Sequence, residues 1–211
     1  MKVVCFGDSN TWGYNPVDGT RYDERTRWPK LLEQYGDYEV IEEGLNGRTI
    51  SFEDPLNPNR CGQKILRMVL ETHKPFDVLV IMLGTNDMIE MHHCDSMSIA
   101  TGIRNLIHIA KNPFLWEDYP MPEILVVAPL LFHPCMENVP DMITYYGTDS
   151  FQKARELPNY MKDFCDQYGC HFMNAADFAS ASSIDGVHLD EEGHAALAEG
   201  IAAKLNEIAK L

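Results

Sequence analysis

Residues 77–83 constrain the fold most, because every position after Asp77 in this run is apolar (Val78-Leu79-Val80-Ile81-Met82-Leu83). A strand that is covered by helices on both faces has this composition, whereas a strand with one solvent-exposed face alternates apolar and polar residues. Shorter β-rich runs occur at Lys2–Phe6, Glu39–Glu42, Ile124–Ala128 and His171–Asn174. Together these runs predict a five-stranded parallel sheet.

Helical patterns separate the predicted strands. Apolar residues recur at helical spacing over residues 27–35, 63–73, 98–111, 151–168 and from about 191 to 210. Pro158 is expected to kink or split the fourth of these helices, and Asp190 is expected to cap the last. Strands that alternate with helices form a parallel sheet with helices on both faces. We therefore predict a flavodoxin-like, three-layer α/β/α fold with residues 1–211 as a single domain.

Composition limits the compartment and the partners. The formal net charge is −15 at pH 7, and like charges repel nucleic acid and anionic membrane surfaces. No segment reaches the roughly 18 consecutive apolar residues of a membrane span. The polar turn after Phe6 leaves no room for the hydrophobic region of a secretory signal peptide. We therefore expect a cytoplasmic protein that binds neither nucleic acid nor membranes.

Metal and cofactor chemistry has little support in the sequence. The segment His92-His93-Cys94-Asp95 contains metal-ligand residue types, but adjacent histidines point in different directions on any regular element. The six cysteines form no C-x-x-C pair and are expected to be free thiols. We expect neither a metal nor a cofactor.

Three polar segments carry the candidate chemistry. Gly7-Asp8-Ser9 follows the first predicted strand, Gly84-Thr85-Asn86-Asp87 follows the third, and Asp185-Gly186-Val187-His188 stands just before the last helix. Open α/β sheets bind their ligands at the carboxyl ends of the strands. A serine hydroxyl needs an adjacent base to act as a nucleophile. His188 is the candidate base for Ser9, with Asp185 to orient its imidazole.

A developing oxyanion would need hydrogen-bond donors close to Ser9. The candidates are the backbone N–H groups of Ser9 and Gly47 and the side-chain amide of Asn86. Gly44 and Gly47 permit the close backbone approach that such a site requires. Each residue alone also has a plainer interpretation, namely a capping loop histidine for His188, a cap or turn for Asn86 and an ordinary loop for the glycines.

The three polar segments and Gly47 together resemble the four sequence blocks of the SGNH (GDSL-type) hydrolases, in the family's order. The flanking residues Thr11-Trp12-Gly13 and 40–45 resemble the bacterial arylesterase/acyltransferase branch, which includes perhydrolases. The resemblance implies that Ser9 is the nucleophile, that His188 is the base and that Asp185 orients it. It also implies an oxyanion hole made by Ser9, Gly47 and Asn86. The family usually has leucine where this chain has Asn10, a departure that bears on local packing and substrate fit.

The resemblance further implies a serine esterase or acyltransferase that acts on small, acetyl-like esters through an acyl-enzyme. Water or an alcohol would accept the acyl group, and peroxide is a further acceptor in this branch. Carbohydrate O-acetylesterase, lysophospholipase and thioesterase activities stay open as alternatives. Relatives are often oligomeric, so we expect a homo-oligomer. The long connections 14–26 and 130–149 are expected to wall the site, with Trp12 and Phe132 as candidate pocket residues.

Two functions from other classes compete with this interpretation. A flavodoxin-type electron carrier would hold a flavin phosphate in the hydroxyl-rich loop at residues 9–13, but Asp8 places a negative charge where the phosphate would bind. An inactive carbohydrate-binding module would keep the fold and lose the chemistry, although the candidate catalytic set is intact. A yellow purified protein would favour the first, and inertness towards activated esters would favour the second.

Overall fold

Five parallel strands form one sheet in the computed structural model, which describes residues 1–55 and 57–210. In chain order they are β1 (Lys2–Gly7), β2 (Glu39–Gly44), β3 (Val78–Met82), β4 (Glu123–Ala128) and β5 (His171–Asn174). They lie side by side in the order β2-β1-β3-β4-β5, and each neighbouring pair is parallel. This is the flavodoxin-like order, in which ligands bind at the carboxyl edge near β1 and β3. The predicted fold is confirmed.

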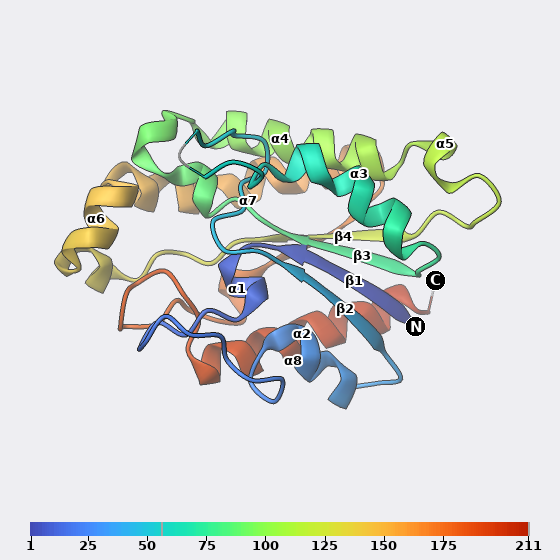
Figure 1. Ribbon diagram of the computed structural model, residues 1–211, viewed down its shortest axis with the longest axis horizontal. Coiled ribbons are helices and arrows are strands. Elements are labelled where there is room, and N and C mark those ends of the chain that lie inside the picture. Colours follow the sequence, from blue (N-terminus) through green and yellow to red (C-terminus); the bar gives the residue numbers. More distant parts are fainter. Residues whose placement is uncertain (56, 211) are drawn as a thin grey trace.

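Helices cover both faces of the sheet (Figure 1). The longer helices are α3 (Gly62–His73), α4 (Ser96–Ala110), α7 (Asp149–Tyr168) and α8 (Glu191–Ile208). The shorter helices are α1 (Ser9–Trp12), α2 (Trp28–Leu31), α5 (Pro113–Trp116) and α6 (Pro140–Tyr146). The 3₁₀ helices are η1 (Leu32–Gln34), η2 (Asn86–Met88), η3 (Glu90–His92), η4 (Pro134–Asn138) and η5 (Ala175–Asp177). Helices α3, α4 and α7 pack on one face, and α2 and α8 pack on the other.

Side chains from alternate positions of each strand enter two separate hydrophobic cores. Val4 and Leu79 pack in the core beneath α3, α4 and α7, whereas Val3 and Val78 pack in the core beneath α2 and α8. Successive residues of a strand point to opposite faces, so a strand between two cores must be apolar throughout. Strand β3 is accordingly buried at all five positions, which explains the unbroken apolar run in the sequence.

Pro158 lies inside α7 and does not split it, so that part of the prediction is wrong. A proline within a helix costs about 3 kcal/mol or more. Ala154, Leu157, Met161 and Cys165 of α7 are all buried in the core. Fully burying a large apolar side chain contributes about 1.5–3 kcal/mol, so this packing offsets the cost of the proline.

Two other segments differ from the predictions. The helix predicted over 27–35 is α2 followed by η1, because the last turn of a short helix often tightens to 3₁₀ geometry. The long connection 130–149 contains η4 and α6, each of which starts at a proline, Pro134 or Pro140. Proline suits the first turn of a helix. These two prolines therefore mark helix starts within the connection.

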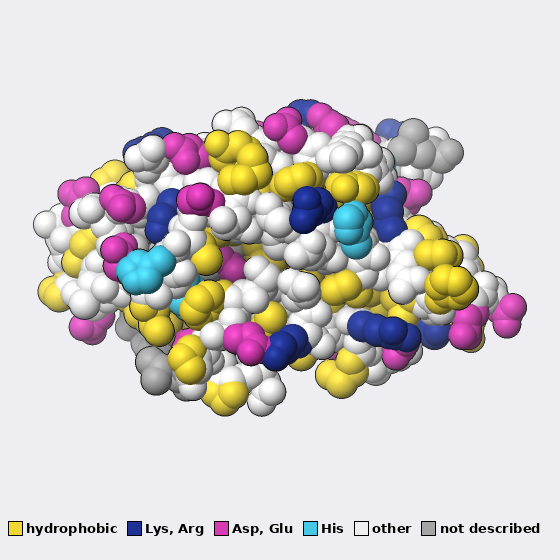
Figure 2. Space-filling view, turned by 90° about the horizontal axis from the view of Figure 1, so that it is seen from above, with side chains coloured by type: hydrophobic (Ala, Val, Ile, Leu, Met, Phe, Trp, Pro, Cys, Tyr) yellow, Lys and Arg dark blue, Asp and Glu magenta, His cyan; other side chains and the backbone are white. Residues whose placement is uncertain are grey.

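The surface carries acidic side chains among scattered lysines and arginines on the face that Figure 2 shows. Hydrophobic side chains on this face form small separate groups. Within residues 1–55 and 57–210, no helix combines the length and apolar character that a membrane crossing requires.

Candidate active site

Ser9 lies at the carboxyl end of β1, as the first residue of α1. The Asp8 carboxylate caps this short helix by accepting the Asn10 N–H at 3.0 Å. Gly7 permits the abrupt passage from strand to helix, because a Cβ at this position would collide with the Thr11 side chain and lie 2.8 Å from the Met82 carbonyl oxygen. The local sequence therefore fixes the Ser9 hydroxyl at the edge of the sheet.

His188 faces Ser9 from the loop before α8. Its Nε2 lies 3.0 Å from Ser9 Oγ, and its Nδ1 lies 2.6 Å from Asp185 Oδ2. Both histidine and aspartate are largely buried, with 8% and 6% of their surfaces exposed. The fold thus brings the three predicted residues into one hydrogen-bonded chain, although 179 positions separate Ser9 from His188.

Asp185 also shapes the loop that carries His188. Its Oδ1 accepts the backbone N–H groups of Val187 and His188, each at 2.9 Å. Gly186 has φ 79°, a left-handed conformation that favours glycine. Burial raises the pKa of the Asp185 carboxyl, but the hydrogen bonds and charge of His188 outweigh it and bring the pKa below its ordinary value. Asp185 is therefore ionised at neutral pH.

The predicted oxyanion donors come from the ends of three adjacent strands, since Ser9 follows β1 and β1 lies between β2 and β3. Gly47 lies in the loop after β2 with φ 74°, and Asn86 begins η2 after β3. The Asn86 side chain is held at both ends, since its Nδ2 donates to the Arg48 carbonyl at 3.0 Å and its Oδ1 accepts the Tyr146 hydroxyl at 3.4 Å. The bond to the Arg48 carbonyl uses one of the two N–H groups of the Asn86 amide.

A cavity of about 330 Å³ opens beside these groups. Its lining residues are Ser9, Tyr14, Asn46, Gly47, Asn86, Asp141, Met142, Tyr145, Tyr146 and His188. The predicted pocket residues Trp12 and Phe132 are not among them. The Phe132 ring packs behind the wall against Tyr146, with ring centroids 4.9 Å apart, and the Trp12 ring faces the Arg21 guanidinium at 5.3 Å.

Tyr14 is a site residue that sequence reasoning did not single out, and Tyr146 of the connection 130–149 also lines the cavity. The Tyr14 ring lies against the His188 imidazole, with centroids 4.2 Å apart. The long connections that contain these two tyrosines were expected to wall the site, and they do. A tyrosine in a loop carries no signal of its own, so the particular residues could not be chosen before the fold was known.

Buried charges lie beneath the site. Burial raises the pKa of Asp8 to about 6 and that of Asp87 to about 7. Asp87 nevertheless accepts the Ile50 N–H at 2.7 Å and the Ser51 N–H at 3.3 Å, so it ties the segment after Gly47 to η2.

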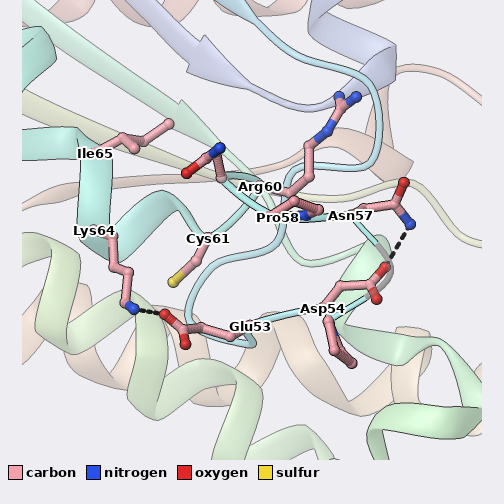
Figure 3. Close-up of a pocket in the computed structure, with 10 residues that line it drawn as sticks. Glu53, Asp54, Asn57, Pro58, Arg60, Cys61, Lys64 and Ile65 are labelled. Carbon is pink, nitrogen blue, oxygen red and sulfur yellow. Dashed lines mark hydrogen bonds and ion pairs between the residues drawn. The ribbon is translucent and has the colours of Figure 1, made fainter.

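A second cavity of about 360 Å³ is lined by residues 53–55, 57–61, 64 and 65 (Figure 3). Its charged residues pair with close neighbours, Lys64 with Glu53 and Asp54 with Asn57. Arg60 donates to the Asn46 carbonyl. Since Asn46 lines the first cavity, Arg60 on the wall of the second cavity supports the loop that bounds the candidate site.

The segment His92-His93-Cys94-Asp95 does not form a metal site. His92 stacks on the Phe52 ring, with centroids 3.6 Å apart. In the part of the chain that the structure describes, no three His, Cys, Asp or Glu side chains converge on a point that could hold a metal ion.

The parallel sheet and the residues at its carboxyl edge define a carboxylic ester hydrolase of the SGNH type. The model of the GDSL-like Lipase/Acylhydrolase family matches residues 5–196, and the chain belongs to this family. The comparison with curated proteins gives no match.

Solved structures agree with the family assignment. Est24, a carbohydrate acetylesterase from Sinorhizobium meliloti, has a TM-score of 0.93 and 35% identity, with 99% of each chain covered. The native aryl esterase of M. smegmatis has a TM-score of 0.90 and 33% identity over 98% of this chain and 99% of its own. A carbohydrate acetylesterase family member from Sinorhizobium meliloti has a TM-score of 0.90 and 33% identity, with all of each chain covered.

Proposed function

We propose that this protein hydrolyses small-acyl esters through a covalent acyl-enzyme on Ser9. The observation that carries the proposal is the chain of contacts from Ser9 Oγ through His188 to Asp185, at 3.0 Å and 2.6 Å. In the first step Ser9 Oγ attacks the ester carbonyl carbon while His188 Nε2 accepts the hydroxyl proton. Asp185 stabilises the resulting imidazolium and holds its tautomer.

The tetrahedral intermediate collapses when the carbon–oxygen bond to the alcohol breaks. His188 gives its proton to the departing alcohol, which leaves an acyl group on Ser9. A water molecule or a second alcohol then attacks the acyl carbonyl carbon while His188 accepts its proton. The second tetrahedral intermediate collapses when the bond between the acyl carbon and Ser9 Oγ breaks, His188 returns its proton to Ser9 Oγ, and the acid or the new ester is released. In both steps the N–H groups of Ser9 and Gly47 and the Asn86 amide donate to the oxyanion. The Ser9 N–H is available because the first N–H groups of a helix lack intrahelical acceptors.

A small acyl group fits the size and walls of the cavity. Its volume is about 330 Å³, at the lower end of the roughly 300–1,000 Å³ of ligand pockets. Tyr146 and Met142 narrow it, and the buried Phe132 ring stands directly behind Tyr146. Both the acyl and the alcohol group must share this space, which favours acetyl-like acids over long chains.

Hydrolysis of p-nitrophenyl acetate, butyrate and octanoate by the wild-type protein and Ser9→Ala tests this function. We expect turnover to fall from acetate to octanoate and to vanish in Ser9→Ala. A preference for octanoate would instead support a lipase, lysophospholipase or thioesterase. Equal slow rates in both proteins would refute the serine mechanism.

A carbohydrate O-acetylesterase is the second candidate. Tyr14 and Tyr145 present aromatic rings to the cavity, and Asn46 and Asp141 add polar groups that could bind sugar hydroxyls. Two of the similar structures are described as carbohydrate acetylesterases. Comparison of kcat/KM for an acetylated xyloside and phenyl acetate separates the candidates, since a sugar esterase should prefer the xyloside.

The homo-oligomer stays a prediction, which sedimentation velocity tests.

A further inference from the structure

Asp185 does not connect the loop that carries His188 to the segment that carries Ser9. Asp185 lies on the same loop as His188, and its bonds to Val187 and His188 hold that loop together internally. Two backbone hydrogen bonds tie this loop to other segments, because the His133 N–H donates to the Gly186 carbonyl at 2.9 Å and the Ser182 N–H donates to the His188 carbonyl at 2.7 Å. None of these bonds reaches the Ser9 segment, so a direct contact between the two segments would hold Nε2 more closely against the Ser9 hydroxyl.

Asn10 is adjacent to Ser9 and makes this connection. Its Oδ1 accepts the Leu189 N–H at 2.9 Å, and its Nδ2 donates to the Val187 carbonyl at 3.4 Å. The two bonds thus hold the backbone on either side of His188 against the Ser9 segment. Asn10 is 2% exposed, and its own backbone N–H is bound to the Asp8 carboxylate. The residue that holds the loop is therefore itself fixed in place.

We infer that Asn10 is a positioning residue that sets the distance between the His188 imidazole and the Ser9 hydroxyl. This inference rests on the proposed function, because the distance matters only if His188 serves Ser9 as base. A displacement of about 1 Å between reacting groups can cost about 100-fold in rate. Loss of the carboxamide would also leave the Leu189 N–H and the Val187 carbonyl without their partner, which favours displacement of the loop.

The size of the Asn10 side chain and its hydrogen bonds can be tested separately. Asn10→Ala removes the bonds and leaves a void, whereas Asn10→Leu removes the bonds and fills the space. If the bonds position His188, both variants should lose about 10- to 100-fold in kcat on p-nitrophenyl acetate. Since the cavity walls are unchanged, kcat and kcat/KM should fall together. Inactivation of Ser9 by phenylmethylsulfonyl fluoride should slow by the same factor.

The proton NMR signal of the His188 imidazole distinguishes displacement of the loop from general destabilisation of the protein. The far-downfield proton NMR signal of the His188 Nδ1–H reports its bond to Asp185, which lies within the loop. We expect this signal to persist in both variants while kcat falls. The matched control is Asn112→Leu, which removes the bond of 3.1 Å from the Phe114 N–H to Asn112 Oδ1 at α5. Helix α5 lies at the opposite end of the molecule from α6 (Figure 1), so kcat should not change.

Hydrogen exchange in the wild-type protein tests the same contact without any variant. The Leu189 amide should exchange slowly, because its N–H is bonded to a buried oxygen. Exchange at the rate of an open loop would overturn the inference. A wild-type kcat in Asn10→Leu would also overturn the inference, because it would show that the volume of the side chain alone holds the loop. An absence of Ser9-dependent esterase activity in the wild-type protein would instead refute the proposed function.

Discussion

Replacement of Asp185 by asparagine separates the chemical role of its charge from its structural role. In Asp185→Asn the side-chain oxygen can still accept the Val187 and His188 N–H groups, which Asp185 Oδ1 now accepts at 2.9 Å. The loop should therefore keep its shape. The amide nitrogen would take the place of Oδ2, 2.6 Å from His188 Nδ1, and would donate a proton there. His188 would then carry its own proton on Nε2 and could not accept one from Ser9.

The expected loss follows from this change of tautomer. The same substitution in the serine-protease triad lowers kcat by about 10⁴, and each factor of ten corresponds to about 1.36 kcal/mol of barrier. We therefore expect a barrier higher by about 5.4 kcal/mol. The assay is steady-state hydrolysis of p-nitrophenyl acetate, with a thermal melt to show that the variant is folded.

Asp185→Ala is the matched comparison. It removes the acceptor for the two backbone N–H groups as well as the charge, so it should lower both kcat and the melting temperature. Asp185→Asn should lower kcat alone. If Asp185→Asn turned over substrate near the wild-type rate, Asp185 would not orient His188, and the proposed proton path would be wrong.

Four further substitutions test the surroundings of the site. Asn86→Ala should lower kcat by about 10²–10³ through loss of an oxyanion donor. Tyr146→Phe should lower kcat by less, because it removes only the hydroxyl that holds Asn86. Equal kcat in the wild-type protein and both variants would exclude Asn86 as an oxyanion donor. Burial raises the pKa of Asp87 to about 7, so its contribution to stability is present below about pH 4 and is lost as pH rises through about 7. Urea unfolding of Asp87→Asn should accordingly show a shallower loss of stability over that range, and an unchanged slope would contradict this. Asp141→Asn should raise kcat/KM for esters of anionic alcohols relative to neutral ones by removing a negative charge from the cavity wall, and an unchanged ratio would show that Asp141 does not face the alcohol group.

The sequence predicts the sheet well because the signal is local. A strand between two cores must be apolar at each position, and β3 shows this directly. The positions of Ser9 and Asn86 followed, because polar residues directly after such strands must lie at one edge of a parallel sheet. Pro158 does not split α7, since the buried face of α7 stabilises the helix more than a single proline weakens it.

The rest depends on contacts between distant segments. Asn10 differs from the residue usual in the family, but its partners are backbone groups at Val187 and Leu189, and no residue pattern reveals these. The contact between the Tyr14 ring and the His188 imidazole likewise depends on the path of a loop. Trp12 was chosen for its nearness to Ser9 in sequence, but the turn of α1 directs its ring towards Arg21 and away from the lining of the cavity.

The acyl-enzyme is the central claim, and its direct detection tests that claim best. The wild-type protein would be mixed with excess p-nitrophenyl acetate, quenched in acid within the first turnover and analysed by intact-mass and peptide mass spectrometry. We predict one added acetyl group, located on the peptide that contains Ser9 and absent from Ser9→Ala. An acetyl group on another residue, or rapid turnover with no covalent adduct at Ser9, would contradict the account.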